Sequence, residues 1–217
     1  MKKLVLLLVA GFSFTFVEVA QAQRIGIKAG VNYSNLAGDL DSEAQNENKV
    51  GFVGGIGTSI PLVGDGFLSL APELLYSQKG YKYRDDEFTV GSNVMKYTGK
   101  VDFSYLDLPV LLKVNASGLV FEGGPVGSYL LSVKDRSKIT TNNMETDNVN
   151  KIDRDDLGKF EVGYAAGVGY MTPGGFSLGL RYNGNFSKLA NDNDGGDLRN
   201  SRHSLFQATI GYLVGSK

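Results

Sequence analysis

Apolar side chains recur at every second position along most of this chain, which is the period of a β-strand. In residues 24–34, for example, Ile25, Ile27 and Val31 fall on one face, and glycine and polar residues fall on the other. The same alternation occurs in eight segments: 24–34, 50–60, 67–78, 101–114, 119–133, 159–171, 176–187 and 203–214. No helical period follows the first 22 residues. We therefore predict an all-β fold of eight antiparallel strands.

The connections between these segments alternate in length. Three are short and rich in turn-forming residues, at 63–66, 115–118 and 172–175. Four are long and polar, at 35–49, 79–100, 134–158 and 188–202. Outer-membrane barrels have short periplasmic turns and long extracellular loops. The alternation predicts an eight-stranded antiparallel up-and-down transmembrane β-barrel, with both termini in the periplasm and the long loops outside the cell.

The two faces of the expected strands differ in chemistry. One carries glycines and charges of both signs, and the other carries large apolar side chains with aromatic residues near its ends. A water-soluble barrel would turn its apolar face inward, whereas a polar lumen and an apolar exterior suit a barrel in lipid. The aromatic residues near the long loops are Tyr33, Phe52, Tyr76, Tyr129, Phe160, Tyr182, Phe186 and Phe206, and those near the short turns are Phe121, Tyr170, Phe176 and Tyr212. We expect them to form two belts at the membrane interfaces.

Three prolines fall inside the expected strands, at Pro72, Pro109 and Pro125. Proline cannot donate a hydrogen bond to a β-ladder, and a closed barrel has no edge strand to accommodate it. Each proline is therefore expected to mark a β-bulge or a local break in strand pairing.

The N-terminus has the pattern of an export signal. Lys2 and Lys3 precede an apolar run at 4–17, and Ala20 and Ala22 supply the small residues that a signal peptidase recognises. The apolar run is shorter than the roughly 20 residues of a membrane-spanning helix, which favours a cleaved signal over an anchor. We expect a signal peptide at residues 1–22 and one barrel domain at residues 23–217.

Charge and cysteine content exclude two classes of protein. Removing residues 1–22 takes away two lysines and Glu18, which changes the formal net charge from −1 to −2. A nucleic-acid-binding domain would be basic, so no nucleic-acid partner is expected. The chain has no cysteine, which excludes a small scaffold held together by disulfides.

Four motifs stand out in the expected strands: PELLYSQKG at 72–80, YLDLPVLLKV at 105–114, VGYAAGVGY at 162–170 and LGLRYNGNFS at 178–187. They resemble the outer-membrane β-barrel "porin family" domain of Gram-negative bacteria, and the resemblance extends over essentially the whole mature chain. It implies an eight-stranded barrel of the OmpA/OmpX-like class. It implies no particular activity, because the family is defined by its fold. The C-terminus departs from the usual terminal aromatic residue, and Tyr212 stands in its place.

Eight charged residues lie on the face that we assign to the lumen: Arg24, Lys28, Glu73, Asp107, Lys113, Glu122, Glu161 and Arg181. An eight-stranded barrel is only wide enough for its side chains to fill it, and buried charges must pair. We predict a paired network of Glu73, Lys113, Glu122 and Arg181, with Asp107 and Glu161 nearby. The network is interpreted as an ion-pair plug that holds the barrel together, and a charged conduit is the alternative.

The single histidine does not predict a catalytic site. His203 and Ser204 are neighbours on an expected strand, so their side chains point to opposite faces and do not form a nucleophile–base pair. His203 lies where the last long loop meets the last strand, and we expect it to be a solvated residue.

Cofactor and metal sites are not predicted either. The acidic run at 191–197 resembles a calcium loop, but a register that places Gly195 sixth puts Ala190 and Ser201 where carboxylates belong. The glycine clusters at 54–57 and 167–169 do not open helices, which argues against a dinucleotide site.

The sequence thus predicts a membrane-embedded scaffold, not an enzyme, that presents four polar loops for envelope structure or surface binding. Its expected partners are outer-membrane lipid, the barrel-assembly machinery during insertion, and a surface ligand that the sequence does not identify. The alternatives are a narrow, low-conductance pore and, third, a lipid-modifying barrel enzyme. The sequence gives no sign of the oligomeric state.

Overall fold

The computed structural model describes residues 24–37, 46–63, 66–83, 86–90, 93–141, 144–151, 158–187 and 201–214. The expected signal peptide at 1–22 and the acidic run at 191–197 lie outside these residues. Within the described part of the chain, no α-helix is long and apolar enough to cross a membrane.

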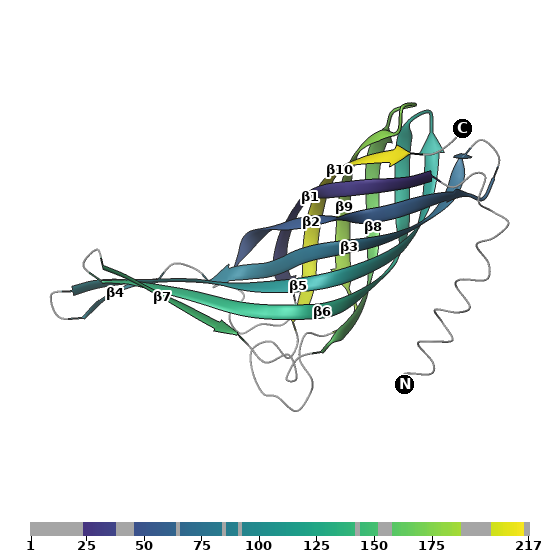
Figure 1. The fold of residues 1–217 in the computed structure, drawn as a ribbon. Coiled ribbons are helices and arrows are strands. Elements are labelled where there is room, and N and C mark those ends of the chain that lie inside the picture. Colours follow the sequence, from purple (N-terminus) through teal and green to yellow (C-terminus); the bar gives the residue numbers. More distant parts are fainter. Residues whose placement is uncertain are drawn as a thin grey trace.

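The described residues form one antiparallel sheet that closes on itself (Figure 1). Its strands are β1 (Arg24–Ala37), β2 (Asn46–Pro61), β3 (Leu68–Tyr83), β4 (Asp86–Val90), β5 (Asn93–Ala116), β6 (Leu119–Thr141), β7 (Met144–Lys151), β8 (Phe160–Met171), β9 (Phe176–Asn185) and β10 (Arg202–Val214). They pair in the order β4-β5-β3-β2-β1-β10-β9-β8-β6-β7, and a further pairing of β5 with β6 closes the ring. Eight strands thus form the barrel, as predicted, and β4 and β7 lie outside the ring.

The short turns form one end of the barrel, which we call the short-turn end. Ser117 and Gly118 connect β5 to β6 with φ angles of 54° and 96°. Two successive positive φ values are typical of the two-residue turns that match the twist of a β-hairpin. Arg24 and Val214 lie at the same end, because Ile25 pairs with Val214. The opposite end of the barrel, from which β4 and β7 extend, is called the long-loop end.

The structure corrects the prediction that residues 79–100 and 134–158 are loops. Much of both segments is β-strand: β5 and β6 continue past the expected boundaries, and their extension pairs Thr98 with Lys138 and Lys100 with Arg136. The short strands β4 and β7 pair with the outer edges of this extension. In Figure 1 the four strands project well beyond the rest of the barrel. The extension carries polar residues on both faces, so the alternation that identified the other strands is absent from it.

The apolar face of the barrel is exposed, as expected of a surface in contact with lipid. Large apolar side chains point outward along all eight barrel strands. Phe160 and Tyr170, at opposite ends of β8, are 65% and 53% exposed. Ten residue steps at about 3.3 Å, tilted by about 40°, rise about 25 Å, which is the height of the apolar band of a transmembrane barrel. The predicted aromatic belts therefore have the separation that a membrane requires.

A bulge in β6 reverses part of the predicted inward and outward pattern. The register of β5 against β6 shifts between Ser104 and Tyr105, and β6 accommodates one extra residue between Leu130 and Ser132. The alternation that puts Phe121 and Tyr129 on the lipid face predicts the same face for Val133, but Val133 is 2% exposed in the barrel interior. The prediction was wrong because one inserted residue moves every later side chain to the other face.

The prolines coincide with interruptions in pairing and not with register shifts. The pairing of β3 with β5 passes from Pro72–Val110 to Leu75–Asp107, and that of β5 with β6 passes from Pro109–Val126 to Leu112–Gly123. The second interval contains Pro125. The register of the paired strands is the same on both sides of each interval, so no residue is inserted. The prolines therefore mark local breaks in pairing and not β-bulges, which were the two expected possibilities.

The interior at the long-loop end contains an apolar cluster. Its buried members come from four strands and are Leu36, Tyr81, Val101, Phe103, Tyr105, Leu130 and Val133. Phe103 and Tyr105 stack at a centroid distance of 6.4 Å. The lumen is therefore polar for part of its length and filled by aromatic and aliphatic side chains near the long-loop end.

Candidate functional site

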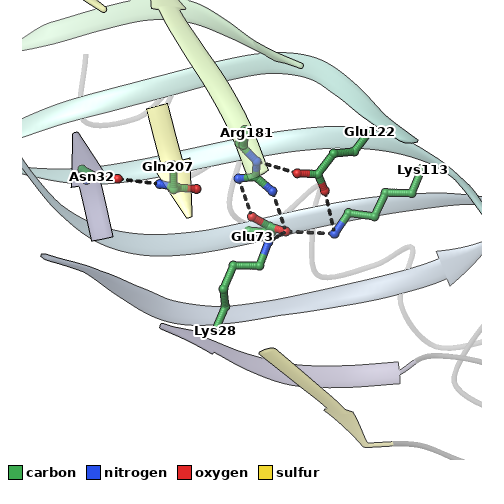
Figure 2. Close-up of polar contacts among 7 residues, drawn as sticks. All are labelled: Lys28, Asn32, Glu73, Lys113, Glu122, Arg181 and Gln207. Carbon is green, nitrogen blue, oxygen red and sulfur yellow. Dashed lines mark hydrogen bonds and ion pairs between the residues drawn. The ribbon is translucent and has the colours of Figure 1, made fainter. Parts of the chain in front are cut away.

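A network of charged side chains crosses the lumen between the middle of the barrel and the short-turn end (Figure 2). Arg181 of β9 donates two hydrogen bonds to the carboxylate of Glu73 of β3. Arg181 Nη1 lies 2.9 Å from Glu73 Oε2, and Arg181 Nη2 lies 3.2 Å from Glu73 Oε1. β3 and β9 are four strands apart in the eight-stranded ring, on opposite walls. This two-bond contact therefore spans the lumen.

Three further residues complete the network. Arg181 Nε donates to Glu122 Oε1 at 2.7 Å. Lys113 Nζ lies 3.0 Å from Glu73 Oε1 and 3.3 Å from Glu122 Oε2, and Lys28 Nζ lies 2.7 Å from Glu73 Oε1. Figure 2 shows Arg181 and Lys113 each in contact with both carboxylates, and Lys28 approaching Glu73 from below. The structure thus brings together the four residues of the expected network and adds Lys28, which had been placed on the lumen face only.

Glycines beside the network leave room for the long charged side chains. Gly57 faces Glu73 in the pairing of β2 with β3, and a Cβ at Gly57 would lie 3.0 Å from Glu73 Cγ. Gly167 faces Arg181, and a Cβ there would lie 3.1 Å from Glu122 Oε1. Glu73 and Arg181 are each 4% exposed. Charges at this depth are tolerated because each has opposite charges and hydrogen-bond partners within contact.

A layer of neutral polar side chains lies beside the network, toward the long-loop end. Gln207 Nε2 donates to Asn32 Oδ1 at 3.0 Å, and Asn32 Nδ2 donates to Ser77 Oγ at 2.9 Å. All three side chains are buried. They link β10, β1 and β3 across the interior, and Figure 2 shows the Asn32–Gln207 pair next to the charged residues.

Asp107 and Glu161 belong to a second polar group, nearer the long-loop end. Lys79 Nζ lies 3.0 Å from Asp107 Oδ1 and donates to Ser128 Oγ at 3.2 Å. Glu161 accepts hydrogen bonds from the Tyr105 hydroxyl and the Asn185 amide. The two carboxylates thus have partners of their own and make no direct bond to the Glu73 network among the described residues.

His203 belongs to this second group, which corrects the expectation of a solvated side chain. It is 2% exposed, and its ring meets Phe103 and Tyr105 edge to face at 5.0 and 5.6 Å. Its Nε2 lies 3.3 Å from the Tyr105 hydroxyl. The prediction was wrong because His203 pairs with Leu36 inside a strand that begins at Arg202, so its side chain points into the lumen.

Sequence reasoning also missed a set of charges at the long-loop end. Lys79 had been assigned to a loop, although it shares the inward parity of Glu73 and Ser77, and extending the alternation by two residues would have found it. Farther out, Asp102 Oδ1 lies 2.7 Å from Lys49 Nζ, and Asp102 Oδ2 lies 3.3 Å from Arg136 Nε. Lys49 and Arg136 fall in segments that we had assigned to loops, so the sequence carries no signal for these two contacts.

A cavity of about 850 Å³ occupies the lumen between the charged network and the short-turn end. Its lining includes Arg24, Lys28, Glu73, Lys113 and Glu122. Metal binding finds no support in the described residues, because they contain no group of three histidine, cysteine, aspartate or glutamate side chains that could hold an ion.

Solved structures with a similar chain path are outer-membrane barrels. The attachment invasion locus protein Ail of Yersinia pestis is 13% identical and covers 89% of this chain and 99% of its own, with a TM-score of 0.43. Neisserial surface protein A is 14% identical, covers 87% and 96%, and has a TM-score of 0.39. The outer membrane protease OmpT of Escherichia coli is 11% identical, covers 88% and 97%, and has a TM-score of 0.40. No curated protein sequence is similar enough to count as a relative.

A protein-family model gives the assignment that these distant structures cannot. The model of the outer membrane protein beta-barrel domain matches residues 19–191, which is most of the chain. The match agrees with the closed ring of eight antiparallel strands and with its exposed apolar exterior. The chain belongs to the outer membrane protein beta-barrel domain family.

Proposed function

We propose that this protein is a non-enzymatic scaffold of the outer membrane, which presents its long-loop end outside the cell for envelope structure or surface binding. The mature protein would consist of residues 23–217 after removal of the signal peptide. Both termini and the short turns would face the periplasm. The Glu73 network would hold the barrel walls together and would not line a path for ions.

The observation that carries this proposal is the closure of the lumen at two levels. Arg181 and Glu73 bridge opposite walls at the first level. At the second level, Tyr105 of β5 and His203 of β10 also come from opposite walls and meet at 3.3 Å. Phe103, Tyr105 and Leu130 are at most 1% exposed there. Side chains buried to this degree obstruct the lumen within the described part of the barrel, which supports a scaffold over a narrow pore.

The extension at the long-loop end supports surface presentation. The short strands β4 and β7 and the outer parts of β5 and β6 project past the barrel, and β4 and β7 lie outside the closed ring. A protein that only anchors itself in lipid does not need such an extension. Because loops and projections carry binding functions in proteins with rigid scaffolds, this end is the natural place for a partner to bind.

Reconstitution in planar lipid bilayers separates the scaffold from the pore. We expect insertion of the purified, folded protein without steady current above the membrane baseline. Stepwise, ohmic current that rises with the number of inserted molecules would contradict the scaffold and favour the alternative of a narrow pore.

Single cysteines test the proposed orientation, because the natural chain has none. Thr146 is exposed on β7, and Val63 is 53% exposed in a short turn. We expect a membrane-impermeant maleimide to label Thr146→Cys on intact cells and Val63→Cys only after the outer membrane is opened. The reverse result would show that the long-loop end faces the periplasm.

A further inference from the structure

The cavity at the short-turn end is a blind pocket. Its volume of about 850 Å³ lies within the range of small-molecule binding sites, about 300–1,000 Å³. The Glu73–Arg181 bridge closes it toward the middle of the barrel. Small lumen-facing residues such as Gly179, Gly211, Ser177 and Thr209 line its wall. The pocket is therefore reached from the short-turn end.

The charges at this pocket do not balance. Three cations, Arg24, Lys28 and Lys113, and two carboxylates, Glu73 and Glu122, line the cavity. A fourth cation, Arg181, binds both carboxylates from behind the lining. No third carboxylate lines the cavity in the part of the chain that the structure describes. The formal excess is two positive charges. An unbalanced charge inside a barrel surrounded by lipid is costly, and a bound anion would offset it.

The two lysines that face the cavity keep N–H donors available for a ligand, whereas Arg181 does not. Arg181 is 3% exposed in its side chain and uses three nitrogens on Glu73 and Glu122. Lys28 and Lys113 are 16% and 20% exposed, and each ammonium group has three N–H donors. Lys28 bonds one carboxylate oxygen, which leaves donors that can point into the pocket. Arg24 lies at the outer part of the lining and has no acidic partner among the described residues.

We propose that this pocket binds a small, soluble organic anion that carries carboxylate or phosphate groups and enters from the short-turn end. Lys28 and Lys113 contact the anionic group at the inner end of the pocket, and Arg24 contacts the ligand near the mouth. The hydroxyl groups of Ser177 and Thr209 are placed to bond the rest of the ligand. The site is distinct from the surface-presenting role, because it lies at the opposite end of the barrel.

Isothermal titration calorimetry of the folded mature protein tests the proposal, with citrate and inorganic phosphate as probes. The protein is kept in an uncharged detergent and a phosphate-free buffer. We expect saturable binding with one site per barrel for at least one of the two. Citrate alone, phosphate alone, or both would identify which anionic group the pocket takes. Lys113→Met removes a charge-assisted bond, so we expect at least about tenfold weaker binding. Lys82→Met, an exposed lysine at the long-loop end, is the matched control and should bind as the natural protein does.

Arg24→Gln keeps the test decisive if Lys113→Met does not fold, because Arg24 makes no ion pair within the described barrel. We expect it to fold normally, as judged by a gel shift between unheated and boiled samples, and to bind several-fold more weakly. The proposal is overturned if neither probe binds saturably. It is also overturned if binding is unchanged in the folded pocket variants, or if Lys82→Met weakens it equally.

Discussion

At the scale of single residues, the lumen depends on a few cross-barrel contacts. The inward parity of Glu73, Lys113, Glu122 and Arg181 follows from the period of two, so their placement on one face could be predicted from sequence. Their distances could not, because these depend on how four strands curve around the lumen. Arg181 holds a central place, since it touches both carboxylates of the network.

Removing Arg181 should destabilise the barrel. Arg181→Ala leaves Glu73 with two lysines and Glu122 with one, and it removes every bond across the lumen within the network. We expect the free energy of unfolding in lipid vesicles to fall by about 3–5 kcal/mol, or less if water from the adjacent cavity reaches the carboxylates. The control is Arg202→Ala, an exposed arginine on β10, which should change stability by less than about 0.5 kcal/mol. Equal effects of the two substitutions would argue against a structural network.

The second polar group gives an independent prediction. Tyr105→Phe keeps the ring packed against Phe103 and His203 but removes the hydroxyl that donates to Glu161. Glu161 is buried, so a lost hydrogen bond should cost about 1–3 kcal/mol in an equilibrium unfolding measurement. Tyr129→Phe, at a 43% exposed position on the outer face, should have almost no effect. If both variants unfold alike, the Glu161 contact is not stabilising.

At the scale of elements, the sequence identified the eight barrel strands and missed their extensions. Alternation is visible only where one face of a strand meets lipid and the other meets the lumen. Beyond the membrane both faces meet water or other polar groups, and β5 and β6 continue there through backbone pairing alone. The bulge near Tyr105 is invisible for a related reason, because one inserted residue changes no composition and only reverses the later side chains.

Hydrogen exchange should distinguish the extended strands from the loops that the alternation predicted. Backbone amides in 95–104 and 132–141 that pair β5 with β6 should exchange much more slowly than those of an unstructured chain. Residues 106–112 of β5, inside the barrel, serve as a protected reference. Exchange in the extension at the rate of a flexible loop would contradict the pairing.

At the scale of the whole molecule, the barrel combines a lipid-facing exterior, a lumen that side chains cross at two levels and a projection at one end. The exterior and the number of strands could be predicted from the sequence, because both follow from the alternation and from the lengths of the connections. The filling of the lumen by an aromatic cluster could not, since Phe103, Tyr105 and His203 come from strand ends that pattern analysis assigns least securely. Function depends on that filling, because it decides whether the barrel is a scaffold or a conduit.

The most direct test of this account is the current through Arg181→Ala in a planar lipid bilayer. The substitution removes one level of closure and leaves the level at Phe103, Tyr105 and His203 intact. The account predicts that the folded variant inserts, is less stable than the natural protein, and still passes no steady current. A variant of unchanged stability with a new, ion-selective current would show that Arg181 gates a conduit, and it would contradict the scaffold.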